Sequence, residues 1–277
     1  MSYVWTAEQI TRYFGYYDGL TTRNDYSYLT FETTPEFARS VLPPCFEAAD
    51  RPLVTVSFMS FMEVAGGHTN RFGRDSAAMI HINARFGAHE GIYYLSVFET
   101  EEVNLETGRE LWGMPKKLAA VDSFDDGQRL WGFVERKGHR LIEIEADLGA
   151  ELGPQPAEPE YYFEIRGGFT ANGFRLTSAE VLVFRLGAHT SRFRELTSPR
   201  VVLTGSPVDP GVGTVPLGAF VEGGNLGGQT AYEVVDVVPL DVERDDYAPF
   251  ILGRLYDDWP DFRDTEGRRT TATLITP

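Results

Sequence analysis

The sequence predicts a mainly β (α+β) protein in which antiparallel strands form a barrel-like body or two packed sheets, with a few peripheral helices. Three observations support this prediction. Aromatic residues, which favour strands, make up 13% of the 277 residues. The 28 glycines and 16 prolines indicate many turns. Several long segments alternate apolar and polar residues, as half-buried strands do. We expect one domain over 1–277, although the linker-like segment 149–160 could divide it into two halves.

Two short helices are expected near the front of the chain. "TAEQITRYF" (6–14) lies in an N-terminal helical segment, 1–20, and starts with Thr6, which can cap the helix. "TTPEFARSVLPP" (33–44) has a threonine cap, Pro35 in the first turn and a Pro-Pro stop. Both patterns predict helices that lie outside the β body.

Strand patterns follow from there to the last quarter of the chain. In "AMIHINARF", Ile80 and Ile82 alternate with polar residues, which is typical of a half-buried strand. The strand-like segments are 53–64, 78–86, 91–103, 129–148 (a hairpin about "KG"), 161–187 and 231–243. "GGNLGGQT" (223–230) is expected to be a tight turn near a pocket, 247–259 a helix, and 264–277 a tail.

Charge and composition exclude several classes of partner. A formal net charge of −16 argues against nucleic acid and against anionic membranes, since both need a basic face. We find no signal-peptide pattern and no membrane-length apolar run. The single cysteine, Cys45, fits a reducing compartment, so a cytoplasmic location is expected. The histidine and cysteine spacings predict no metal site.

The lysines are the most unusual feature of the composition. Only three of the 25 basic residues are lysine, and two of these, Lys116 and Lys117, are adjacent in "ELWGMPKKLA"; the third is Lys137. A solvated surface pair is the ordinary explanation for adjacent lysines. Lysine, unlike arginine, can lose its proton and attack a carbonyl to form a Schiff base. Burial in an apolar pocket, with a cation nearby, lowers the pKa that opposes this step.

These residues carry a resemblance to a known family. "ETGRELWGMPKKLA" (106–119) resembles the signature of the acetoacetate decarboxylase family, G-R-E-x-x-x-x-P-K-K, over a wider similarity from about residue 20 to 245. The resemblance implies that Lys116 is the Schiff-base nucleophile and Lys117 its neighbour. It also implies a β-rich fold with a central pocket, no cofactor and a homo-oligomer. Because an extended chain alternates its side chains, only one of the two lysines should reach a given pocket.

The sequence departs from the family pattern in its acidic residues. The family's first pocket glutamate falls at Ser57, and the second falls in "GGHTNRFGRDS", which offers Arg71, Arg74 and Asp75. Glu63 is a nearby alternative carboxylate. The family's front arginine falls near Arg23-Asn24, where the alignment leaves both residues open. The lysine is therefore kept while its acidic partners differ.

Two functional hypotheses follow. The first is a cofactor-free, decarboxylase-like lyase that forms an imine with a small keto acid other than acetoacetate, or that uses the same imine for aldol, dehydration or cyclisation chemistry. Its expected catalytic residues are Lys116 and Glu63; the expected substrate-binding residues are Arg71, Arg74, Trp112 and Lys117. The second is a β-barrel protein that binds a small hydrophobic ligand without turnover. The lysine distinguishes them, because only the enzyme needs it.

Overall fold

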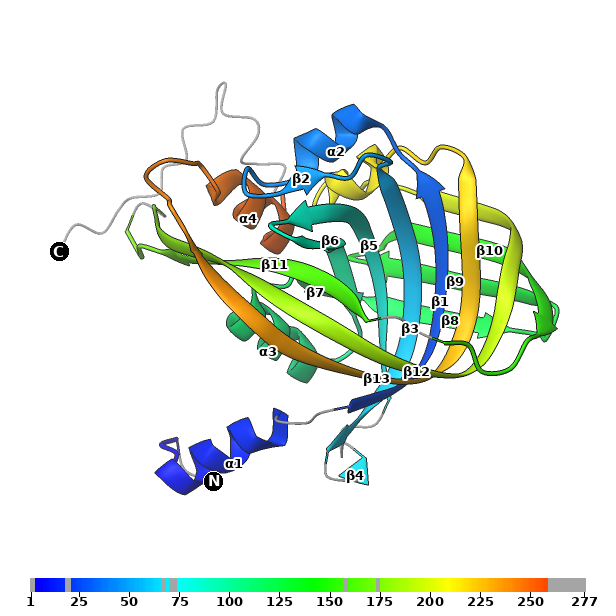
Figure 1. The fold of residues 1–277 in the computed structure, drawn as a ribbon, viewed down its shortest axis with the longest axis horizontal. Helices are drawn as coiled ribbons and strands as arrows, with labels where there is room; N and C mark the ends of the chain where they lie inside the picture. Colours follow the sequence, from blue (N-terminus) through cyan, green and yellow to red (C-terminus); the bar gives the residue numbers. More distant parts are fainter. Residues whose placement is uncertain are drawn as a thin grey trace.

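The computed structural model describes residues 3–17, 21–65, 68–69, 74–156, 159–172 and 175–258, with the backbone alone at 14–17, 63–65 and 68–69. The order of paired strands is β11-β6-β5-β3-β1-β13-β12-β10-β9-β8, and a further pairing between β11 and β12 closes the first seven into a ring. The prediction of a mainly β, antiparallel, barrel-like fold is confirmed. Figure 1 shows the long strands of the ring and the β8–β10 layer beside it.

The bounds of the strands are as follows. The ring contains β1 (Thr21–Glu32), β3 (Leu53–Ala65), β5 (Asp75–Phe86), β6 (His89–Glu99), β11 (Glu160–Phe169), β12 (Leu176–Leu203) and β13 (Phe220–Leu240). The layer that continues from β12 contains β8 (Ala120–Asp125), β9 (Arg129–Arg136) and β10 (His139–Glu151). The short strands are β2 (Glu47–Ala48), β4 (His68–Thr69) and β7 (Lys116–Leu118).

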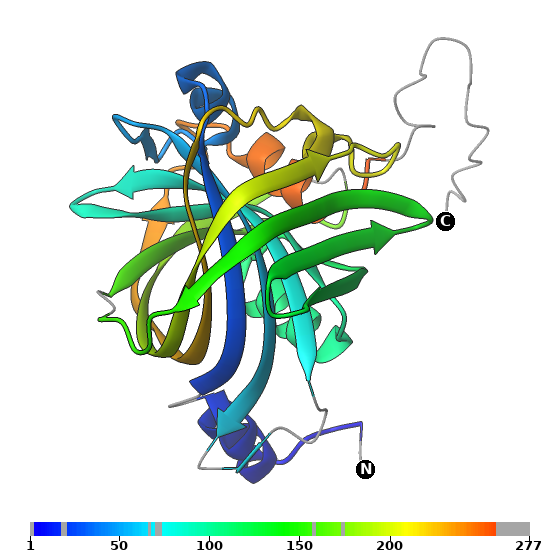
Figure 2. The ribbon, with the colours of Figure 1, turned by 90° about the vertical axis from the view of Figure 1, so that its right-hand side faces the viewer.

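The helices lie at the ends and edges of the strand body. They are α1 (Ala7–Tyr17), α2 (Pro35–Val41), α3 (Glu102–Trp112), the 3₁₀ turn η1 (Pro210–Thr214) and α4 (Ala248–Leu255). Figures 1 and 2 agree that α2, η1 and α4 gather at one end of the ring and α1 at the other. The α2 prediction is confirmed in detail, since Thr34 accepts a hydrogen bond from the Phe37 amide and Pro35 is the first helical residue.

The main apolar core lies on one face of the ring strands. Val56 and Ile80 are buried there, together with Ile144 and Val134 from the β8–β10 layer. Strand alternation sends the neighbouring side chains to the opposite face. On that face Tyr26 of β1 lies near enough to Tyr94 of β6 to help raise the pKa of Tyr94, although β3 and β5 separate these strands in the ring. This face is therefore the interior of the ring.

The structure differs from the sequence predictions at three places, two where a prediction was wrong and one where a strand was not predicted. The strand predicted over 91–103 ends at Glu99, and the helix α3 begins at Glu102. The glycine-rich stretch 223–230 is an inner part of β13 rather than a tight turn. An added Cβ at Gly224 would lie 2.7 Å from the Tyr28 ring, so glycine makes room for an aromatic side chain on the neighbouring strand. The strand β1 was not predicted.

The remaining predicted elements are largely in place. The hairpin about "KG" joins β9 to β10, with both turn residues at positive φ, 51° at Lys137 and 79° at Gly138, as a two-residue hairpin turn requires. The predicted C-terminal helix corresponds to α4, although it ends at Leu255. The predicted tail, 264–277, lies outside the described residues. None of the described helices is long and apolar enough to cross a membrane.

Candidate active site

The signature segment folds as a helix, a turn and a short strand. Residues 102–112 form α3, and Gly113 ends it in the left-handed conformation with φ 69°. A side chain at Gly113 would also meet the Ile165 carbonyl oxygen at 2.5 Å, so glycine is required there by backbone conformation and by space. The chain then enters β7, which pairs in parallel with β6 and places Lys116 opposite Val97.

Gly108 of α3 makes room for the Lys116 side chain. An added Cβ at this position would lie 2.4 Å from Lys116 Cε and 2.8 Å from its Nζ. Glycine inside a helix costs about 1 kcal/mol relative to alanine. The close approach of the lysine explains why the motif has glycine here despite that cost.

Arg109 fixes the backbone that carries the lysine. Its Nη1 donates to the Lys116 carbonyl at 2.8 Å and to the Leu255 carbonyl at 2.7 Å. One guanidinium therefore ties β7 to the end of α4. The "GR" pair of the motif thus serves two purposes: the glycine provides space for the side chain and the arginine holds its main chain.

The Lys116 ammonium is buried and paired. Lys116 is 7% exposed, and its Nζ lies 2.8 Å from Glu99 Oε1. Nζ also donates to the Asn104 carbonyl oxygen at 3.1 Å. Glu99 is itself 3% exposed, so this pair is shielded from solvent. The charged group in contact with Lys116 is thus an anion, whereas the sequence predicted a nearby cation.

A second carboxylate is connected to the lysine through Asn104. Asp75 Oδ2 accepts from the Asn104 amide at 2.7 Å, while Oδ1 accepts from the Thr100 hydroxyl at 2.8 Å and from the Ser76 amide at 2.7 Å. Asp75 is buried. It therefore anchors the first turn of α3, the segment whose carbonyl contacts Lys116.

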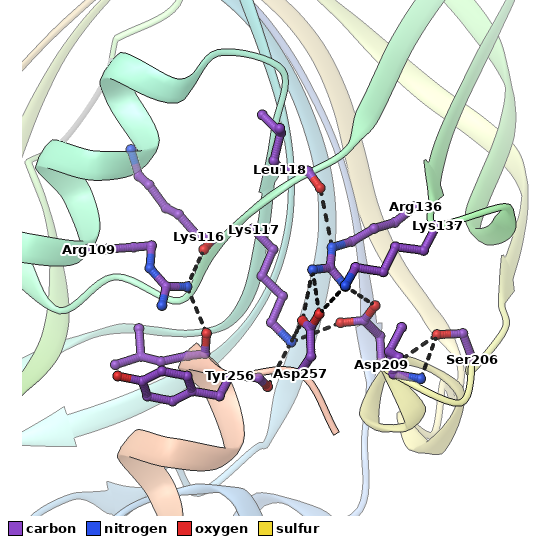
Figure 3. A network of polar contacts seen from close by, with 12 residues as sticks. Arg109, Lys116, Lys117, Leu118, Arg136, Lys137, Ser206, Asp209, Tyr256 and Asp257 are labelled. Atoms are coloured by element: carbon purple, nitrogen blue, oxygen red, sulfur yellow. Dashed lines mark hydrogen bonds and ion pairs between the residues drawn. The ribbon is translucent and has the colours of Figure 1, made fainter. Parts of the chain in front are cut away.

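Lys117 points away from Lys116, as strand alternation predicts (Figure 3). Its Nζ lies 2.8 Å from Asp209 Oδ1 and donates to the Tyr256 carbonyl at 3.1 Å. Arg136 contacts the same Asp209 at 2.7 Å and also Asp257 at 2.8 Å. This network joins β7, β9, the segment before η1 and the segment after α4. Because its ammonium is engaged there, the position of Lys117 favours a structural role over substrate binding.

A cleft of about 560 Å³ runs along this network. Both lysines line it, with residues of α3 and of the segment that follows α4. Its lining is Leu105, Arg109, Lys116, Lys117, Leu118, Arg136, Leu255, Tyr256 and Asp257.

The ring interior is rich in aromatic side chains. Tyr94 packs edge-on against His81, with ring centroids 5.5 Å apart, and against Tyr162 at 5.7 Å. Tyr162 stacks on Phe184 at 4.3 Å. Burial lowers the pKa of His81 to about 4, so this imidazole is neutral at pH 7. Burial also raises the pKa of Tyr94 and of Tyr162, so both phenols stay protonated. The interior thus contains packed aromatic rings and uncharged hydrogen-bonding groups.

The structure shows where the positions expected to match the family's first glutamate and front arginine lie. Ser57 is fully buried on β3, opposite Tyr28, and so faces the ring interior. Asn24 is buried on the same face of β1, whereas Arg23 is exposed. The ring interior therefore contains a buried serine and a buried amide side chain at these two positions.

The predicted substrate-binding residues are more scattered. Arg74 is exposed; its guanidinium contacts the Ser60 hydroxyl and lies 3.6 Å from Asp25. Trp112 ends α3 and packs edge-on against Phe184, with centroids 5.7 Å apart. Arg71 lies outside the described residues, and the side chain of Glu63 does too. Their assigned roles stay predictions.

Two buried carboxylates were missed by the sequence reasoning. Glu99 contacts Lys116 directly, and Glu164 of β11 is fully buried near it. The strand patterns offered one signal for Glu164, because "YYFEI" puts an acid among apolar strand residues. Within the part of the chain that the structure describes, no group of three His, Cys, Asp or Glu side chains is arranged to hold a metal ion.

A β ring with a buried lysine beside a carboxylate defines a class of protein, one with a candidate amine nucleophile at its site. Comparison with known proteins identifies the family. The model of the acetoacetate decarboxylase family, "Acetoacetate decarboxylase (ADC)", matches residues 5–197, and the chain belongs to this family.

Individual relatives match over shorter stretches or at lower identity. "Acetoacetate decarboxylase 2" of Mesorhizobium japonicum is 33% identical over 148 residues, which are 51% of this chain and 54% of that protein. "Acetoacetate decarboxylase 1" of Bradyrhizobium diazoefficiens is 35% identical over 34% of this chain and 36% of its own length. The matched part thus spans about a third to a half of these curated relatives.

Solved structures share the fold. Acetoacetate decarboxylase of Legionella pneumophila superposes with a TM-score of 0.67 at 18% identity, over 83% of this chain and 89% of that one. A second match is the enduracididine biosynthesis enzyme MppR, solved in complex with the condensation product of pyruvate and imidazole 4-carboxaldehyde. It superposes with a TM-score of 0.62 at 14% identity, over 78% of this chain and 88% of that one.

Proposed function

We propose that this protein is a lyase of the decarboxylase type that forms a Schiff base between Lys116 and a small keto acid. The observation that carries the proposal is the Lys116 ammonium, which is 7% exposed and 2.8 Å from the carboxylate of Glu99. A buried lysine in contact with a proton acceptor is a suitable imine-forming nucleophile. Membership of the acetoacetate decarboxylase family supports the same class of reaction.

The chemistry begins with the transfer of a proton from Lys116. Glu99 takes a proton from the ammonium, and the free amine attacks the keto carbon. Water leaves and a protonated imine remains. This imine withdraws electrons from the bond to the neighbouring carboxylate, so carbon dioxide departs and an enamine forms. Protonation of the enamine carbon and hydrolysis then return the free lysine.

We further propose that acetoacetate is a poor substrate. The family's first glutamate is expected to fall at Ser57 and its front arginine near Arg23-Asn24, and of these Ser57 and Asn24 are buried. Asp75, from the loop expected to carry the second glutamate, is engaged by Thr100 and Asn104. Losing a positioned proton-transfer group costs about 10²–10⁴-fold in the step that it serves. Glu63, Arg71 and Arg74 remain our expected proton-transfer and carboxylate-binding residues, and a small keto acid the expected substrate.

A second candidate is an aldol or dehydration reaction through the same imine. The neutral, aromatic interior favours it, because an enamine formed there would meet planar carbonyl partners rather than a decarboxylation-specific acid. MppR, which shares the fold, was solved with a condensation product of pyruvate and an aromatic aldehyde. Both candidates need Lys116, and they differ in the step after the imine.

The experiment is a substrate panel with matched lysine variants. Carbon dioxide release from acetoacetate is measured beside aldol and dehydration products from pyruvate and aldehydes. Lys116→Arg keeps the charge but cannot form an imine, so it should have no turnover. Lys137→Arg, at the exposed β9–β10 hairpin, should behave as wild type. Activity of Lys116→Arg would refute the imine, and fast release from acetoacetate would refute our substrate assignment.

A further inference from the structure

Glu164 is a fully buried carboxyl at a gap in the strand pairing. Strand β6 pairs with β11 over Gly91–Tyr93 and with β7 over Val97–Glu99, so residues 94–96 lie between its two partners. Glu164 stands on β11 just beyond the last pair, and Lys116 is the first residue of β7. The acid and the lysine thus approach the same gap from its two sides.

Arg254 of α4 fills this gap and holds one oxygen of the acid. Its Nη1 donates to the Tyr94 carbonyl at 2.6 Å and to Glu164 Oε2 at 3.0 Å, and its guanidinium lies over the Tyr93 ring at 4.2 Å. The other oxygen, Oε1, is buried and has no hydrogen-bond partner among the residues that the structure describes. A buried, unsatisfied carboxyl oxygen is costly unless a ligand engages it.

The surroundings of Glu164 favour its protonated form. Burial raises the pKa of Glu164 to about 8, although the positive charges of Arg254 and Lys116 partly oppose the rise. The other groups that face it are the uncharged phenols of Tyr93, Tyr94 and Tyr162, and Leu182 opposite on β12. Near neutral pH the carboxyl can thus donate a proton.

Imine formation creates a need for such a donor. The ammonium carries three protons and the protonated imine keeps one, so two protons must reach the departing oxygen. Glu99, in contact with Nζ, serves the transfer from nitrogen. The carbinolamine hydroxyl needs a second proton when its C–O bond breaks, because it leaves as water while the nitrogen lone pair forms the C=N bond. With Glu99 held at the nitrogen, a second buried acid can serve the proton transfer to the departing oxygen.

We propose that Glu164 is the catalytic acid that protonates the carbinolamine hydroxyl through Oε1, and that Arg254 is a positioning residue that holds the opposite oxygen. This inference rests on the proposed function and assigns one step of it. Glu164 regains its proton when imine hydrolysis runs the same step in reverse. The helix α4 thereby contributes to a site that is otherwise built from the ring and α3.

The test measures the rate of imine formation against pH. Pyruvate, acetoacetate and acetone serve as probes, borohydride traps the imine, and mass spectrometry counts the label on Lys116. Glu164→Gln keeps an oxygen for Arg254 but has no proton to transfer. We expect trapping to be about 10²–10⁴-fold slower than in wild type. Wild type should slow as the pH rises above 8, and the variant should lack this fall.

Two further variants separate catalysis from structure. Arg254→Gln removes a charge that lowers the pKa of Glu164, so the high-pH fall should move to higher pH. Glu180→Gln alters the Glu180–Arg166 ion pair on the same face and should leave the profile unchanged. Circular dichroism checks the fold of each variant. Wild-type rates and pH dependence in folded Glu164→Gln would overturn the inference alone. Absence of label in wild type with all three probes would overturn the proposed function itself.

Discussion

At Gly108, one added methyl group would compete for space with the Lys116 side chain. An alanine Cβ would lie 2.4 Å from Lys116 Cε. Helix propensity would favour alanine by about 1 kcal/mol, so the two effects act in opposite directions on stability. We predict that Gly108→Ala folds but loses at least about 10²-fold in turnover, because a small displacement of the nucleophile is costly.

The matched control is Gly253→Ala, in α4, where an added Cβ meets nothing within 4 Å. It should keep wild-type turnover and gain a few tenths of a kcal/mol or more in the free energy of unfolding. Turnover equal to wild type in Gly108→Ala would show that the lysine tolerates displacement, and the account of the motif glycine would be wrong.

Single residues were predictable from the sequence where a rule of composition or a motif singled them out. Lys116 stood out because the chain otherwise uses arginine, and the motif singled out the same residue. Glu99 did not stand out, because it contacts Lys116 only through the parallel pairing of β6 with β7, which brings together strands separated by a helix. Glu164 and Arg254 are 90 residues apart in the sequence, so no local pattern predicts that they meet.

At the scale of elements, the helix α3 was not predicted from the sequence. The strand pattern continues into "TEEV", and Gly108 lowers helix propensity in the middle of the segment. The helix forms because packing outweighs that cost: Thr107 and Gly108 are buried and Arg109 is bonded to two carbonyls. Most long strands were predictable, because alternation survives in sequence. The part of strand β12 after residue 187 was not predictable, because exposed polar residues interrupt the alternation of apolar and polar side chains there.

The prediction at the scale of elements concerns Arg109, which joins β7 to the end of α4. Lysine at this position keeps the charge but lacks the planar fork that reaches the Lys116 and Leu255 carbonyls together. We expect Arg109→Lys to reduce the free energy of unfolding by about 1–3 kcal/mol and to lower turnover as well. Chemical denaturation and the keto-acid panel measure the two effects.

Arg185→Lys is the control, since Arg185 makes an exposed ion pair with Glu233 that should contribute little. It should stay within about 0.5 kcal/mol of wild type. If Arg109→Lys and Arg185→Lys lost the same free energy of unfolding, the bridging role of Arg109 would be refuted.

At the scale of the whole molecule, a charged network fastens the segment after α4 to the β8–β10 layer. Asp257 contacts Arg136 at 2.8 Å and Lys137 at 2.7 Å. Burial alone would raise the pKa of Asp257, but the hydrogen bonds from these two cations outweigh it and lower the pKa to about 2. The unfolded value is about 3.9, so this carboxylate stabilises the fold fully above about pH 4 and the contribution is lost as the pH falls towards 2.

We therefore predict that Asp257→Asn lowers the free energy of unfolding by about 1–2 kcal/mol at pH 7, and that the difference from wild type vanishes as the pH approaches 2. Denaturant titrations over this range measure it. Asp50→Asn is the control, because its ion pair with Arg85 involves an aspartate side chain that is 96% exposed. A difference that persists unchanged at pH 2 would show that the Asp257 charge does not stabilise the fold.

The claim on which the whole account depends is that Lys116 forms an imine, and covalent trapping tests it most directly. The protein is incubated with pyruvate, acetoacetate and a wider panel of keto acids, reduced with borohydride and digested, and the label is located by peptide mapping. We predict a single label on Lys116, whose ammonium is buried beside Glu99, and none on Lys117 or Lys137, which are paired with Asp209 and Asp257. Label confined to Lys117 or Lys137, or no label across the panel, would contradict the account.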